Sequence, residues 1–141
     1  MIREYKGYYE FLKDEMDRFR GDFDNYILYV PEFFKLLCDL LNEDIEKEDR
    51  NKISCALGYF VAPEDVIPEE IYGPAGYIDD IFLCCFVLND LKDKYGIKLL
   101  KSLWNHDEDL EFVLNYSYKE SSKIIKEKNL EDEILKYVGL K

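Results

Sequence analysis

The feature that most limits the fold of this chain is an uninterrupted apolar run from Ile81 to Leu88. A helix through this run is apolar on every side, and such a helix is normally enclosed by other helices. The run is far shorter than the roughly 20 residues that a membrane-spanning helix needs. It therefore predicts a buried central helix from about residue 77 to about residue 95, followed by Gly96 as its stop.

The rest of the chain also has helical periodicity, interrupted by breaker residues. No segment alternates between apolar and polar residues as a strand would, and 141 residues suit one domain. We therefore predict an all-α fold: a single compact domain over residues 1–141, with six or seven helices around the central one. The other helices are expected at about 5–19, 31–41, 53–61 with an exposed charged start, 97–104, 107–128 and 130–138. Asn105 or Asp107 is predicted to cap the 107–128 helix.

The formal net charge of −12 restricts the possible partners. Nucleic-acid phosphates and anionic lipid headgroups repel such a surface, so nucleic-acid binding and membrane attachment are both disfavoured. The charge fits a partner with a basic surface, a bound cation or simple solubility. We expect a protein partner, and nothing in the sequence indicates the oligomeric state.

The four cysteines predict a location. None forms a CxxC pair, and Cys84 and Cys85 are neighbours that cannot bridge each other without strain. Free thiols acting as small buried apolar side chains are the simplest interpretation. With no signal-peptide pattern at the N-terminus, they favour a reducing cytoplasm.

Acidic residues are concentrated where the sequence offers no base. No Lys or Arg occurs between Lys52 and Lys92, so no residue nearby in sequence can neutralise the acids of this window. Glu64, Glu69 and Glu70 are the candidates for contact with a basic partner. The acids of the window are Glu64, Asp65, Glu69, Glu70, Asp79, Asp80 and Asp90.

The same window carries a recognisable motif. The string from Tyr59 to Pro68, followed by Gly76 to Asp80, resembles the YkvA-type family, catalogued as domain of unknown function 1232. The resemblance covers about residues 54–91; it supports a helical fold and implies no activity. The matching positions are Tyr59, Pro63, Asp65, Ile67, Pro68, Gly76, Asp79 and Asp80.

Two interpretations of the motif remain open. In the first, Pro63 and Pro68 end a helix abruptly, while Asp65, Asp79 and Asp80 cap turns and helix starts. In the second, the three aspartates form a divalent-cation site, because Mg²⁺ and Ca²⁺ prefer hard oxygen ligands. Against the second stand the lack of EF-hand spacing and the angle of about 100° between consecutive helical side chains.

No complete catalytic set is present. His106 is the only histidine, and no Ser or Cys nucleophile motif accompanies it. We therefore interpret the chain as a small acidic cytoplasmic protein-interaction module, with enzymatic activity not favoured. The alternative is a metal-binding domain or metal-dependent enzyme that uses Asp65, Asp79 and Asp80, with Mg²⁺ or Ca²⁺ as the one cofactor considered.

Overall fold

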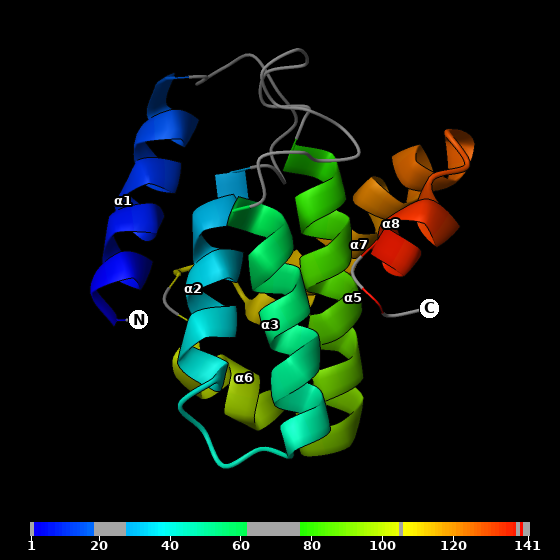
Figure 1. The fold of residues 1–141 in the computed structure, drawn as a ribbon. Helices are drawn as coiled ribbons and strands as arrows, with labels where there is room; N and C mark the ends of the chain where they lie inside the picture. Colours follow the sequence, from blue (N-terminus) through cyan, green and yellow to red (C-terminus); the bar gives the residue numbers. More distant parts are fainter. Residues whose placement is uncertain (1, 19–27, 62–76, 105, 138, 140–141) are drawn as a thin grey trace.

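The computed structural model describes residues 2–18, 28–61, 77–104, 106–137 and 139. Within these residues the chain forms seven helices and no strand, which confirms the all-α prediction (Figure 1). The helices are α1 (Ile2–Arg18), α2 (Val30–Leu40), α3 (Lys47–Val61), α5 (Ile78–Tyr95), α6 (Ile97–Leu103), α7 (Leu110–Glu127) and α8 (Glu131–Tyr137).

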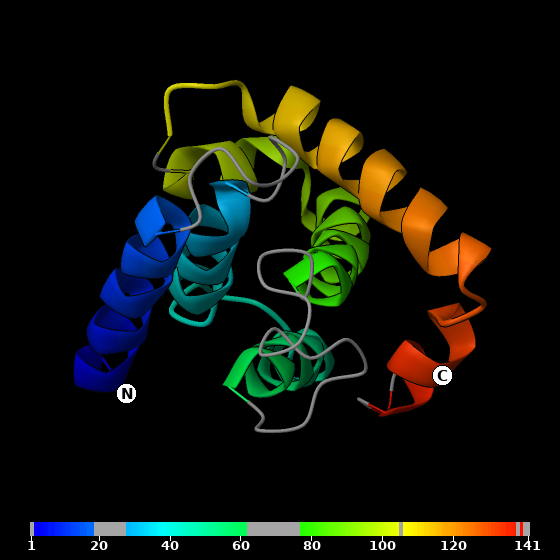
Figure 2. The same ribbon diagram turned by 90° about the horizontal axis from the view of Figure 1, so that it is seen from above.

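Helix α5 occupies the centre, as predicted. It contacts α2, α3, α6, α7 and α8, and its most extensive contact is with α7. Viewed from above, α5 lies between α3 and α7 (Figure 2). Between Ile81 and Leu88 all its side chains are buried except that of Phe86, which is half-buried. Among the described residues, even this apolar helix and its neighbours fall short of what is needed to cross a membrane.

The ends of α5 and α7 follow from local backbone chemistry. Gly96 ends α5 with a φ of 92°, a conformation that costs glycine little because it has no Cβ. At the start of α7 the carboxylate of Asp109 accepts a hydrogen bond from the Phe112 amide at 3.2 Å. The prediction of Asn105 or Asp107 as the cap is therefore wrong. Consecutive acids at 107–109 offer several candidate caps, and their spacing alone does not distinguish among them.

Helix α7 crosses α5 with small residues facing the core. Ser117 and Ser121 are fully buried, and their small side chains let the two helices approach closely. By contrast, α1 lies at the edge of the molecule against α2. Its Leu12 and Met16 are buried, and the hydroxyl of its Tyr9 donates a hydrogen bond to Glu32 Oε1 at 2.8 Å.

The cysteines behave as buried apolar residues. All four are free, with Cys84 and Cys85 buried in α5 and Cys38 and Cys55 half-buried. Burial raises the pKa of the Cys84 thiol well above its usual value, and the neighbouring Cys85 and Asp80 raise it further. Burial likewise raises the pKa of Cys38 to about 12. These thiols are therefore poor nucleophiles at neutral pH.

Candidate functional site

Two buried carboxylates mark the start of α5. Asp79 is 0% exposed and Asp80 1% exposed, and Tyr59, near the end of α3, is 1% exposed. The Tyr59 hydroxyl donates a hydrogen bond to Asp79 Oδ2, and the Asp80 amide donates one to Asp79 Oδ1 at 3.0 Å. Because a buried carboxylate is costly unless donors surround it, these bonds hold Asp79 in place. The contact joins the two halves of the sequence motif.

Only part of the predicted site lies within the described residues. Tyr59, Asp79 and Asp80 come together there. Within the same residues, no group of three His, Cys, Asp or Glu side chains is arranged to hold a metal ion. The convergence of Asp65 with the two other aspartates therefore stays a prediction. Outside the described residues lie Pro63, Glu64, Asp65, Ile67, Pro68, Glu69, Glu70 and Gly76.

A third buried carboxylate, that of Asp49, lies at the opposite end of the α3–α5 pair. Asp49 is only 1% exposed, although the sequence predicted an exposed start for this helix. Its Oδ2 accepts a hydrogen bond from the Tyr95 hydroxyl at 2.6 Å and lies 2.9 Å from Lys94 Nζ. The Tyr95 hydroxyl in turn accepts a hydrogen bond from the Glu46 amide at 2.8 Å. The sequence did contain one indication of this burial, because Asp49 lies on the same helical face as Ile53.

The pKa of Asp49 is lowered in the folded chain. Burial, the largest single influence, raises it, but the hydrogen bonds from Tyr95 and Lys94 together with the charges of Lys94 and Lys52 outweigh burial. Asp49 is therefore an ionised, buried group whose role is to hold the start of α3 against the end of α5.

We expect Asp49→Asn to lower the free energy of unfolding near neutral pH by about 1–3 kcal/mol, because it removes charge-assisted hydrogen bonds. The pKa of an aspartate in an unfolded chain is about 3.9. Since the folded pKa is lower, ionised Asp49 stabilises the fold above that value, and this contribution is lost as the pH falls through the folded pKa. Urea unfolding at a series of pH values gives the free energy of unfolding as a function of pH. Below neutral pH this curve, its acid limb, should fall less steeply for the variant than for the wild type.

Asp44→Asn is the matched control, because Asp44 is an exposed acid in the turn before α3. It should leave both the neutral stability and the acid limb unchanged. Coincident acid limbs for Asp49→Asn and the wild type would contradict the role given to Asp49.

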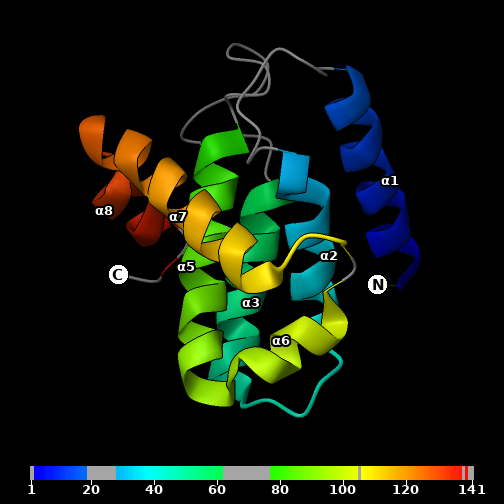
Figure 3. The same ribbon diagram turned by 180° about the vertical axis from the view of Figure 1, so that it is seen from behind.

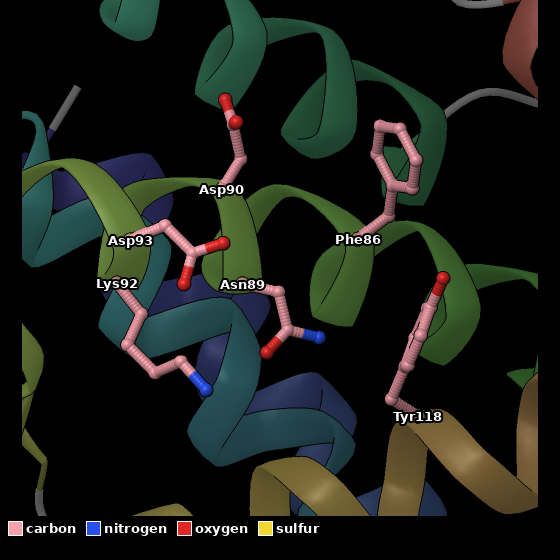
Figure 4. A pocket seen from close by; sticks show the side chains of 6 residues that line it. All are labelled: Phe86, Asn89, Asp90, Lys92, Asp93 and Tyr118. Atoms are coloured by element: carbon pink, nitrogen blue, oxygen red, sulfur yellow. The ribbon is translucent and has the colours of Figure 1, made fainter.

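A groove of about 320 Å³ runs between α5 and α7 (Figure 4). Phe86 from α5 and Tyr118 from α7 form its aromatic end, while Asn89 and Lys92 extend along α5. Asp90 at its edge pairs with Lys52 of α3 at 2.6 Å. The groove thus mixes an amide, an ammonium group and carboxylates beside two rings, and this mixture indicates no single class of ligand.

Aromatic side chains gather on the side of the molecule where α7 begins. Three elements supply this aromatic face, which we define as Tyr29, Trp104, His106, Phe112 and Tyr116. The ring of His106 lies 5.2 Å from that of Tyr29 and 6.0 Å from that of Trp104, and Phe112 stacks on Tyr116 at 5.9 Å. Phe112 is 59% exposed. Figure 3 shows the start of α7 and the connection from α6 next to α2.

The aromatic face was not predicted. The sequence gives His106 and Phe112 no periodic signal, because one lies in a connection and the other on the outer side of its helix. The proximity of His106 to Tyr29 depends on how the residues before α7 lie against the start of α2. One sign was present: Phe112 is a large apolar residue that lies off the helical face of Leu110, Val113 and Leu114.

The fold and the buried contact between Tyr59 and Asp79 define an all-helical protein whose central helix, α5, begins with the last residues of the motif. A family model of proteins of unknown function, DUF1232, matches residues 52–86. Uncharacterized protein ORF9 of Methanothermobacter thermautotrophicus is 36% identical over 140 residues, which cover 99% of this chain and 94% of that protein. No solved structure matches the chain. The chain belongs to the DUF1232 family.

Proposed function

We propose that this chain is a protein-interaction module. The observation that supports it most is the exposure of Phe112, at 59%, where its ring stacks on that of Tyr116. Aromatic side chains are enriched in protein interfaces, where they bury a large area at a small cost in conformational entropy. The net charge of −12 adds long-range attraction toward basic partners and repulsion of nucleic acids.

Photo-crosslinking from position 112 tests this function. A photoreactive phenylalanine analogue in place of Phe112 should give discrete covalent adducts with another protein in cells of the native host. The same analogue at Lys123, an exposed position further along α7, is the control and should give none. Equal adducts at both positions, or none at position 112, would contradict the proposal.

The acidic window offers a second contact region within the same proposal. Charge reversal at Glu64, Glu69 and Glu70 together should weaken recovery of the crosslinked partner, because these acids have no base nearby in sequence. Unchanged recovery would restrict the interaction to the aromatic face.

Divalent-cation binding is the second candidate function. It is favoured by the adjacent burial of Asp79 and Asp80 at the start of α5, since two carboxylates out of water attract a cation. In this case millimolar Mg²⁺, Mn²⁺ or Ca²⁺ should raise the melting temperature by mass action. The increase should disappear in Asp80→Asn and persist in Asp90→Asn, whose carboxylate pairs with Lys52. No shift with any of the ions would leave the aspartates a structural role.

A further inference from the structure

Acidic side chains border the aromatic face. Asp107, Glu108 and Asp109 lie in the connection before α7 and are exposed, and Glu111 follows in the first turn. Asp109 caps the helix and lies 3.5 Å from Lys101. Within the described residues, Asp107, Glu108 and Glu111 have no ion pair. Their carboxylates therefore extend the aromatic surface with uncompensated negative charge.

The connection that carries these acids is held in shape by hydrogen bonds. The indole of Trp104 donates to the Glu108 carbonyl at 2.9 Å, and the Glu108 amide donates to His106 Nδ1 at 3.1 Å. The ring of Trp104 is itself anchored, lying 5.7 Å from the buried ring of Phe33. A surface that is ordered before binding loses less entropy when it binds.

Rings and carboxylates are also close to each other on this surface. The ring of Tyr29 lies 5.2 Å from that of His106, whose Nδ1 accepts a hydrogen bond from the Glu108 amide at 3.1 Å. Burial raises the pKa of Tyr29, and the charges of Glu108 and Tyr116 raise it further. A ligand that reaches Tyr29 therefore meets an aromatic ring and a carboxylate together.

The arginine side chain is complementary to both the aromatic rings and the carboxylates of this surface. The guanidinium group of arginine stacks on aromatic rings and pairs with carboxylates, and it is less strongly hydrated than the ammonium group of lysine. Anionic partners, including nucleic acids and acidic membranes, are repelled by the same carboxylates.

We propose that the aromatic face and its acidic border bind an arginine-rich segment of a partner protein. This inference rests on the proposed function and adds the chemistry of the partner. Arginines would lie over the rings of Tyr29 and Phe112, with their charge directed toward Glu108 and Glu111. Each such contact is weak at an exposed site, so binding depends on several arginines acting together.

The fluorescence of Trp104 supplies the test, because it is the only tryptophan in the chain. A short synthetic peptide of alternating arginine and glycine should change this fluorescence in a saturable manner. Its binding should weaken with added salt. The matched lysine–glycine peptide should bind about threefold to tenfold more weakly, because lysine loses the stacking contribution. A glutamate–glycine peptide should not bind.

Variants locate the binding. Phe112→Ala and the pair Glu108→Gln with Glu111→Gln should each weaken binding of the arginine peptide by about fivefold or more. The pair Glu127→Gln with Glu133→Gln removes the same charge from exposed positions at the end of α7 and on α8, and should have much less effect. Circular dichroism checks that each variant is folded.

Failure of the arginine peptide to bind, or equal binding to all variants, would overturn the arginine proposal. Equal affinity for the arginine and lysine peptides would do the same. Crosslinked adducts at position 112 that persist after such a result would leave the interaction module intact and make only its partner chemistry wrong. If the arginine peptide does not bind and position 112 also gives no crosslinked adducts, the proposed interaction module is contradicted as well.

Discussion

Phe82→Ala should lower the free energy of unfolding by about 3–5 kcal/mol. Phe82 is fully buried in α5, where its ring stacks 6.0 Å from that of Tyr118 and lies 6.4 Å from that of Phe86. Truncation removes these contacts and leaves a cavity between α5 and α7 that surrounding side chains fill only in part. Since a domain is typically stable by about 5–15 kcal/mol, the loss is a large share of the total. Urea unfolding followed by circular dichroism measures it.

Phe112→Ala makes the same chemical change at an exposed position and is the matched control. Because Phe112 is 59% exposed and its ring stacks on the half-buried Tyr116, its loss should lower the free energy of unfolding by no more than about 1 kcal/mol. Losses of similar size for the two variants would mean that α5 is not the centre of the core.

The central helix could be predicted because its signal is local. A run of apolar residues on every side of one helix requires burial wherever the rest of the chain lies, and Gly96 marks its end without reference to other elements. The predicted span of about 77–95 differs from Ile78–Tyr95 by a single residue. The prediction thus depended on covalent neighbours alone, and such information is fully present in the sequence.

The contacts of the aspartates could not be predicted in the same way. Tyr59 and Asp79 were both recognised as motif residues, but their hydrogen bond depends on how α3 and α5 pack. Asp49 belongs to the charged start of its helix, which the sequence predicts to be exposed, yet Lys94 and Tyr95 from a distant segment make its burial possible. A buried charge requires donors supplied by tertiary structure, and sequence spacing does not reveal them.

Taken together, the polar contacts explain how α3 is fixed against α5. Asp49 meets Tyr95 at one end, Lys52 pairs with Asp90 further along, and Tyr59 meets Asp79 at the other end. The order is that of an antiparallel pair. Hydrophobic burial is not directional, so it sets how much surface the helices share but only weakly sets their register. Polar contacts at both ends select one register.

Tyr59→Phe therefore tests the contact at the start of α5. The change keeps the ring and removes only the hydroxyl that donates to Asp79. A hydrogen bond to a buried charged group contributes about 1.5–3 kcal/mol, and we expect a loss of stability in this range. Urea unfolding of Tyr59→Phe, Asp79→Asn and the double variant gives the coupling between the two side chains. The double variant should lose less than the sum of the single losses.

Tyr118→Phe is the control for this cycle. Its half-buried ring packs against the core residue Phe82, but within the described residues its hydroxyl has no hydrogen bond. Removal of that hydroxyl should change the stability by less than about 0.5 kcal/mol. If Tyr59→Phe were as mild as Tyr118→Phe, or if the two single losses at Tyr59 and Asp79 were additive, the contact would not stabilise the fold. The register of α3 against α5 would then depend on Asp49 and Lys52 alone.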